Sequence, residues 1–466
     1  MSNPSSSDEI AKQAPESVSK SAESVGNTSL VDPSDALSFP EGGFTAWGTV
    51  LGALLIQFCG FGYVSAYGVF QDFYTQTYLT NSTPSAIAWI GSINAFLILS
   101  VGIVSGRMVD RGAFYPVMKI GCLLQCFFLF ILSLAKPEQY YQIFLSQGIG
   151  LGFAMGLTNV PSIAVISHHF QRRRAFAMGI VAAGGSLGAI LHPVMLNNLI
   201  NGRLGFANGV RASAALSSGL LFIANLLMRT RLPPQPKIVS YTRVLQNSSR
   251  DGAYICTCVG MAAFEFGYFF ESFYLQLDST LHGLSQGFSF YSLTILSSGS
   301  FIGRLAGGVV AAYVGVPNTI IISSLISSAV LFAMVGLHSS ASVAVIAVSY
   351  GVFSGGVVAM MGPLISHLTP EFSHTGLDTY SQAWEHSWAR APLTFPRQSL
   401  TFGLGAPICG AVLTSHYIWW KAAILAGASE PCQSVATGGC ILFVSMQVIL
   451  KMRQKTSSVY SKGAGV

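Results

Sequence analysis

The stretch HHFQRRRAFAMGIVAAGGSLGA, from His168 to Ala189, places three consecutive arginines directly before a glycine-rich apolar segment. The whole chain has a similar character, because its 466 residues are 51% hydrophobic and only 9% charged. Soluble domains carry about 25% charged residues, which they need for a hydrated surface. We therefore expect lipid to surround most of this chain.

The apolar runs predict helices. In a bilayer every backbone polar group must be satisfied within the protein, so spanning segments are helices or closed barrels. The runs here are long and do not alternate, which favours helices of about 20 residues. Twelve ranges qualify: 45–70, 86–106, 114–135, 140–167, 174–200, 209–228, 252–277, 286–311, 317–337, 342–367, 399–418 and 435–452. The sequence thus predicts an all-α membrane protein with twelve transmembrane helices.

A long basic connection between Arg229 and Gly252 divides these helices into two groups of six. The first residues are rich in Ser, Asp and Glu, and they lack the apolar side chains needed to offset the entropy of ordering. We expect a disordered cytoplasmic tail, an N-terminal half, a linker, a C-terminal half and a second tail, over residues 1–43, 44–228, 229–251, 252–455 and 456–466.

The basic residues predict the orientation. Lys and Arg near span ends concentrate on the cytoplasmic side. With the amino terminus inside, only four of the 24 Lys and Arg residues face outward: Lys136, Arg203, Arg211 and Lys421. We therefore expect a multi-pass protein of the plasma membrane with both termini cytoplasmic. The net charge of +6 belongs to the inner loops and does not indicate a nucleic-acid partner.

Glycines recur at four-residue spacing in two of the spans. Gly184 and Gly188 form one such pair, and Gly148, Gly152 and Gly156 form a series. Small residues at this spacing let helix backbones approach closely in lipid. Two interpretations stay open, which are tight packing alone and helices that rock as a moving gate.

The turn GRMVDRG, from Gly106 to Gly112, and the Phe170–Gly188 segment resemble motifs of the major facilitator superfamily, in its monocarboxylate-transporter-like fungal branch. Gly106, Asp110 and Arg111 match the turn between helices 2 and 3. Arg172 and Arg173 match the basic pair before helix 5. The segment from Glu41 to Trp47 is similar to the branch's motif at helix 1. The resemblance implies two six-helix halves with alternating access, and a cytoplasmic gate of Gly106, Asp110, Arg111, Arg172 and Arg173.

Departures from this family bear on the substrate. The family's transporters of small monocarboxylates use a lysine in helix 1 and an Asp–Arg pair in helix 8. This chain has no lysine in 45–70, and Ser300 stands four residues before Arg304. Arg304 either contacts an anionic substrate or anchors the cytoplasmic end of its span.

Other polar residues within spans are substrate or proton candidates. An ionisable residue inside a membrane is costly and is by default a functional candidate. Glu265 lies near the middle of its span on the face of Tyr268, and it either couples transport to protons or is a neutral hydrogen-bonded acid. Tyr67, Asn94 and Asn159 contact either the substrate or neighbouring helices.

Asn81 begins an Asn-Ser-Thr sequon in the first outer loop, and we expect it to carry any glycan. Residues 378–397 interrupt the apolar pattern, as a genuine insert or as a gene-model error. The sequence shows no nucleophile–base spacing, phosphate loop or metal cluster, so we expect neither an enzyme nor a cofactor.

We expect a secondary active transporter of a small organic solute, most simply an organic acid or a secondary metabolite that leaves the cell. Its partners would be that solute, the lipid bilayer and, with Glu265, protons. The alternatives are proton-coupled uptake of a monocarboxylate or vitamin-like acid, and a membrane sensor on the same fold that does not transport.

Overall fold

The computed structural model describes residues 41–231, 252–281, 284–334, 339–367, 428–432 and 435. All of them belong to one of the chain's two compact units, Phe39–Val466. The expected spans at 399–418 and 435–452, the segment 378–397 and both tails fall almost wholly outside these residues, and so does most of the linker.

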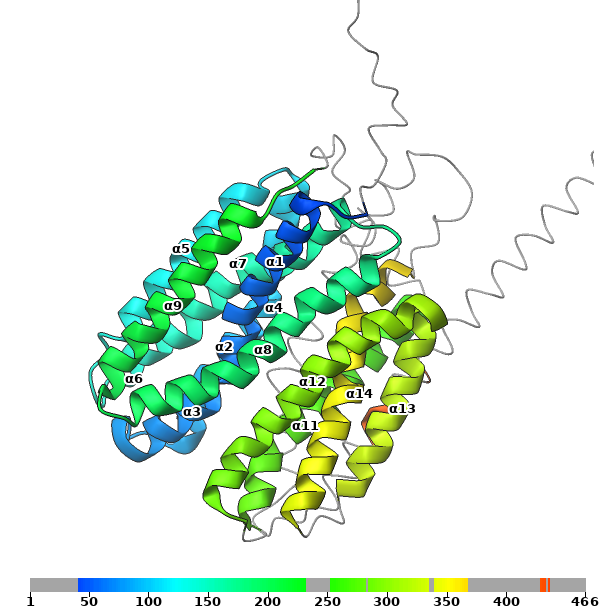
Figure 1. The fold of residues 1–466 in the computed structure, drawn as a ribbon. Helices are drawn as coiled ribbons and strands as arrows, with labels where there is room; N and C mark the ends of the chain where they lie inside the picture. The colour runs from blue at the N-terminus through cyan, green and yellow to red at the C-terminus, as the bar shows by residue number, and fades with distance from the viewer. Residues whose placement is uncertain are drawn as a thin grey trace, which may run out of the picture. The chain divides into compact units, whose positions relative to one another are not determined.

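The described part of the chain is built of helices (Figure 1). Ten of the twelve expected spans are helical there, and nine helices among the described residues are long and apolar enough to cross a membrane. The all-α membrane fold is therefore confirmed. Its α-helices are α1 (Phe44–Cys59), α2 (Phe61–Ser65), α3 (Tyr67–Phe73), α4 (Pro84–Asp110), α5 (Phe114–Leu132), α6 (Tyr140–Ile143), α7 (Leu151–Ala164), α8 (Arg174–Ile200), α9 (Gly205–Leu227), α11 (Gly252–Leu281), α12 (Gln286–Val314), α13 (Val316–Ala333) and α14 (Ser340–His367).

The first span is longer than expected and is broken in two places. It runs from Phe44 to Tyr78 as α1, α2, α3 and a final π-helical turn. Gly60 and Ala66 interrupt it. A carbonyl released by such a break needs a new partner in lipid, and the side-chain amide of Gln125 in α5 donates to the Cys59 carbonyl at 2.8 Å.

The glycines of α8 bring this helix close to neighbours from both halves of the sequence. A Cβ added at Gly188 would lie 2.5 Å from the Phe58 carbonyl oxygen in α1. One added at Gly179 would lie 2.7 Å from the Arg304 carbonyl oxygen in α12. Figure 1 shows α8 between α1 and α12. The expected tight packing is thus confirmed, and rocking stays a prediction.

The C-terminal half contains a buried acid in the described segment 428–432. The assignment of spans places Glu430 in the last outer loop, yet its side chain is fully buried and contacts Ser327 of α13 and Tyr350 of α14. Ser429, Glu430 and Pro431 interrupt the apolar run locally, so hydropathy gives no sign that the Glu430 side chain is buried.

Candidate functional site

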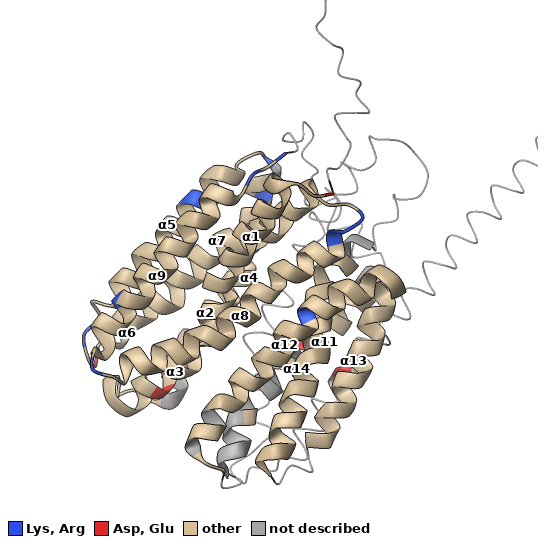
Figure 2. Cartoon of the chain, viewed as in Figure 1, with Lys and Arg blue, Asp and Glu red and all other residues tan. Residues whose placement is uncertain are grey.

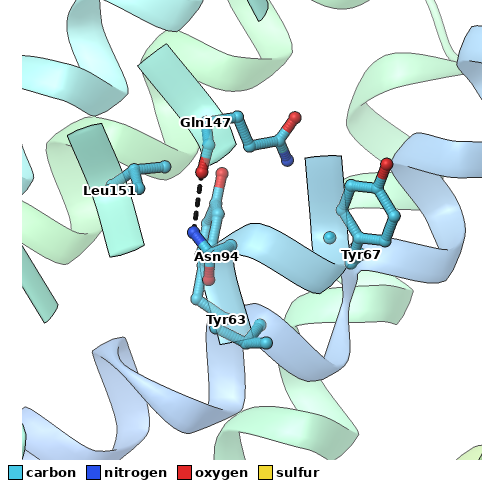
Figure 3. A pocket seen from close by; sticks show the side chains of 7 residues that line it. Tyr63, Tyr67, Asn94, Gln147 and Leu151 are labelled. Atoms are coloured by element: carbon cyan, nitrogen blue, oxygen red, sulfur yellow. Dashed lines mark hydrogen bonds between the residues drawn. The ribbon is translucent and has the colours of Figure 1, made fainter. Parts of the chain in front are cut away.

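A small pocket, with room for about one water molecule, lies beside the break at Ala66 in the first span. Its walls come from α2, α3, α4 and the start of the fourth span (Figure 3). The structure therefore brings together two of the predicted substrate candidates, which are 27 residues apart in the sequence. The lining residues are Tyr63, Val64, Tyr67, Gly91, Asn94, Gln147 and Leu151.

The two candidates present different chemistry to this pocket. The Tyr67 hydroxyl donates to the Ile87 carbonyl, and an added Cβ at Gly91 would lie 2.5 Å from its ring, so Tyr67 offers mainly an aromatic surface. Asn94 donates its side-chain NH₂ to the Gln147 carbonyl at 2.7 Å, while its Oδ1 is buried without a hydrogen-bond partner. A buried acceptor of this kind normally binds a water or a ligand. Asn94 is thus the better polar contact of the two.

Asn159 lies in a separate network. Its side-chain NH₂ donates to Gln57 Oε1 at 3.1 Å, and Gln57 Nε2 donates to Ser162 Oγ at 3.0 Å. These bonds join α1 to α7 deep inside the protein, because all three side chains are buried. Asn159 is not among the residues that line the pocket. The interhelical alternative is therefore favoured for this residue.

Arg304 lies at the contact between α12 and α8. Its Nη1 donates to the Ala182 carbonyl at 2.7 Å, and a Cβ added at Gly185 would be 3.1 Å from the same nitrogen. One turn earlier, Ser300 and Ser186 form a hydroxyl hydrogen bond of 3.1 Å across the same contact. Helix α12 continues for ten residues beyond Arg304, about 15 Å, so the guanidinium does not lie at the end of the helix.

Glu265 is a buried acid within electrostatic range of Arg304. It is 7% exposed in α11 and interacts electrostatically with the Arg304 guanidinium. Arg304 Nε is itself buried without a hydrogen-bond partner. In Figure 2 the coloured acidic position of α11 and basic position of α12 lie part-way along their helices. The structure therefore brings Glu265 within electrostatic range of Arg304, which is 39 residues away in the sequence.

Tyr268, one turn after Glu265, is half-buried and stacks on Phe264 with ring centroids 6.3 Å apart. It packs against both apolar clusters of the C-terminal helices. This places an aromatic surface on the same helix as the buried acid.

The basic pair before α8 is held by Glu41. The Glu41 carboxylate accepts the backbone N–H groups of Gln171, Arg172 and Arg173 at 3.0, 2.5 and 3.1 Å. Backbone amides before a helix form a natural site for an anion. Both arginine side chains are exposed, so the carboxylate positions the backbone of the turn and leaves their charges at the surface.

The other predicted gate segment is a tight turn. Helix α4 ends at Asp110, and Gly112 closes the turn with φ of 86° while its N–H donates to the Val109 carbonyl at 2.8 Å. Arg111 is exposed, and Gly106 packs near Val160 of α7. The Asp110 side chain lies outside the described residues, so its gate role stays a prediction.

Asn81 is exposed at the opposite end of the N-terminal helices from Glu41. The Glu138 carboxylate accepts the backbone N–H groups of Thr80 and Asn81 at 3.1 and 3.2 Å and the Thr80 hydroxyl at 2.7 Å. The sequon therefore begins in an ordered surface turn.

Three residues of these networks were not among the sequence-predicted site candidates. Gln57 and Gln147 are buried amides within spans, which the search for ionisable groups passed over. Glu41 is visible only as part of a motif, because its partners lie about 130 residues away. A search for every amide inside an apolar run would have found the first two.

Comparison with known proteins adds independent information. The family model described as Major Facilitator Superfamily matches residues 49–385. The aspyridones efflux protein apdF of Emericella nidulans is 35% identical over 398 residues, which cover 84% of this chain and 78% of that protein. MFS-type transporter 1 of Ophiocordyceps sp. is 33% identical over 426 residues, which cover 90% of this chain and 89% of that protein.

A third relative, the agnestins efflux protein AgnL12 of Paecilomyces divaricatus, is 31% identical over 316 residues, covering 67% of this chain and 71% of that one. Among solved structures, the transporter FucP in its outward conformation superposes with a TM-score of 0.64 at 13% identity, over 84% of this chain and 98% of that one. The structural likeness at this identity concerns the fold alone.

Proposed function

Because this chain belongs to the Major Facilitator Superfamily, and is therefore a multi-pass membrane transporter rather than an enzyme, we propose that it exports a small organic acid or secondary metabolite by alternating access. The observation that carries this proposal is the position of Arg304. Its guanidinium bonds to α8 of the N-terminal half and interacts with Glu265 of the C-terminal half. A group in this position changes its surroundings whenever the halves move.

The charges of this pair suggest how an acidic solute is coupled to protons. An ionised Glu265 compensates Arg304, and the pair then has no net charge. When Glu265 takes up a proton, Arg304 becomes an uncompensated cation in a low-dielectric region, where an anionic partner is strongly favoured. Proton and anion therefore favour each other's binding. Protonation of Glu265 and occupancy of Arg304 by a solute anion would alternate, during each cycle, with a state in which ionised Glu265 balances the charge of Arg304.

The pocket beside Tyr67 supplies the other half of the proposed binding region. Asn94 offers a buried acceptor and Tyr67 an aromatic face, while Tyr268 offers a second aromatic surface in α11. Such a mixture suits a ring-containing organic solute that also carries a few polar groups. Asn159, committed to Gln57, serves to hold α1 against α7.

Export is the favoured direction because two of the relatives are named as efflux proteins, for aspyridones and for agnestins. We further place both termini in the cytosol and the protein in the plasma membrane. This orientation is supported by the basic residues at one end of the helices. His169 Nε2 lies 2.8 Å from the Arg229 carbonyl oxygen. This contact places the start of the central linker at the same end as Arg172 and Arg173. A basic end of this kind is expected to face the cytosol.

An untargeted metabolite comparison tests the proposal. Cells that lack the protein should retain one or more compounds that the parent strain releases, and reintroduction of the intact chain should restore release. Arg304→Gln should not restore it, whereas Arg203→Gln, which changes an exposed arginine near the end of α8, should. If the amount of every compound in the medium and in the cells were the same for all strains, export would be contradicted.

Vesicles containing the purified protein then separate transport from sensing. A transporter accumulates the labelled compound against its gradient when a proton gradient is imposed. A sensor binds the label without accumulating it, and an uptake system depletes the medium of the parent strain. Either of these two results would replace the proposal.

A further inference from the structure

A second buried acid lies in the C-terminal half, away from Arg304. Glu430 has no exposed surface, and its two carboxyl oxygens contact different helices. Oε2 lies 2.5 Å from Ser327 Oγ of α13, and Oε1 lies 2.5 Å from the Tyr350 hydroxyl of α14. Both partners are also fully buried. These contacts fall well inside α13 and α14, since Ser327 is six residues from the end of α13 and Tyr350 is ten residues from the start of α14.

The described surroundings contain no counter-ion for a carboxylate at this position. Helix α13 has no ionisable residue, and α14 has only Tyr350 itself and His367, which is 17 residues further on, about 25 Å along the helix. In α11 and α12, the neighbouring described charges are Glu265 and Arg304, which interact with each other. The apolar cluster around Tyr350 includes Leu331 and Ala347. An unpaired carboxylate in such surroundings would be strongly disfavoured.

The hydroxyl geometry at Ser327 is consistent with a proton on Glu430. Ser327 Oγ is within hydrogen-bond distance of two acceptors, Glu430 Oε2 at 2.5 Å and the Ser324 carbonyl at 3.1 Å. A hydroxyl has one proton and can donate it only once. If Ser327 donates to Ser324, the hydrogen of the shorter contact must belong to Glu430. The short distance suits a strong O–H···O bond.

We propose that Glu430 is a second proton-binding residue of the C-terminal half, with Oε2–H donating to Ser327, Ser327 donating to the Ser324 carbonyl, and Tyr350 donating to Oε1. In this arrangement every described polar group of the cluster is satisfied without a net charge. The neutral acid fastens the Glu430 segment to α13 and α14 together. The proposal goes beyond the transport mechanism above, which uses the proton on Glu265.

Infrared spectroscopy of the purified full-length protein in vesicles tests it directly. A protonated carboxyl absorbs in a carbonyl region that is separate from that of a carboxylate. At neutral pH, Glu430→Gln should remove intensity from the protonated-carboxyl region of the wild-type spectrum. Glu138→Gln is the matched control, because Glu138 is exposed, and it should remove intensity only from the carboxylate region.

Tyr350→Phe keeps the test decisive if Glu430→Gln does not fold. Loss of one hydrogen bond to Oε1 should move the protonated-carboxyl band to higher frequency without removing it. A Glu430→Gln spectrum that loses only carboxylate intensity, or a band unmoved by Tyr350→Phe, would overturn the proposal. Neither spectrum depends on which solute is transported, so this test and that of the proposed function fail independently.

Discussion

The carboxylate of Glu41 accepts the backbone N–H of Arg172 at 2.5 Å across 131 residues of sequence. This bond joins the motif before the first span to the basic turn before α8. Together with the bonds from Gln171 and Arg173, it replaces the water that these amides would otherwise bind. The basic turn is therefore positioned by an acid from the start of the first span, while its arginine side chains stay at the surface.

Replacing Glu41 should destabilise this end of the protein. Glu41→Ala leaves three amides without their acceptor, and removal of a comparable helix cap costs about 0.5–2 kcal/mol. Glu41→Gln keeps one acceptor oxygen and should have a smaller effect. Thermal unfolding of the purified protein measures both. Asp72→Asn is the control, because Asp72 is exposed and binds a single side-chain amide. Equal melting temperatures for Glu41→Ala and Asp72→Asn would contradict the capping role.

Gly179→Ala should impair transport by separating α8 from α12. The new Cβ would lie 2.7 Å from the Arg304 carbonyl oxygen, and backbone cannot move away as cheaply as a side-chain end. We expect a large loss of transport rate with the protein still present in the membrane. Gly219→Ala in α9 provides the control, because an added Cβ there meets nothing within 4 Å. A normal rate in Gly179→Ala, measured in vesicles, would show that this close contact is dispensable.

The positions of the spans could be predicted because the bilayer dictates both their length and their composition. Ten expected spans are helical in the described residues. The breaks at Gly60 and Ala66 could not be predicted, since they depend on partners such as Gln125 from another helix. Hydropathy registers the apolar character of a segment and says nothing about which neighbour satisfies its carbonyls.

The candidate site was predictable residue by residue but not as an arrangement. Glu265 and Arg304 stand out individually because charge is rare in spans, yet their pairing depends on how α11 packs against α12. The sequence also offered equal grounds for Asn94 and Asn159, and only the structure separates a pocket-lining amide from one held by Gln57. Glu430 was not predicted to be buried, because the polar residues next to it in the sequence lower the local hydropathy.

The turn at Thr80 and Asn81 should loosen only in strong acid. Hydrogen bonds from Thr80, chiefly from its side-chain hydroxyl, hold the pKa of Glu138 below the usual carboxyl value. Since the folded state lowers this pKa, the stabilisation is present above the unfolded pKa and is lost as pH falls through the folded pKa. Hydrogen exchange of the Thr80 and Asn81 amides should thus stay protected at neutral pH. Glu138→Gln should exchange faster at neutral pH, and unchanged protection would exclude the carboxylate as the clamp.

Asn81 should carry any N-linked glycan of this protein. It is exposed in the turn that Glu138 holds, at the end of the helices opposite Arg172 and Arg173. Glycosidase treatment should increase the gel mobility of the wild-type protein and leave Asn81→Gln unchanged. Asn247→Gln serves as the control, because the linker is expected in the cytosol. A glycan on Asn247 would invert the proposed orientation.

Glu265→Gln should uncouple transport from pH. Glutamine keeps the size of the side chain but can neither release a proton nor compensate Arg304. Arg304 would then resemble its state beside a protonated acid at every pH. Wild-type flux should therefore depend on pH across the acidic to neutral range, whereas Glu265→Gln should give a flat profile and lose accumulation driven by a proton gradient. Counterflow, in which labelled solute exchanges for unlabelled solute without net proton movement, should survive.

Glu271→Gln, six residues further along α11 toward the expected outer surface, is the matched control. A wild-type pH profile in Glu265→Gln would remove this acid from coupling and leave Arg304 to act without it.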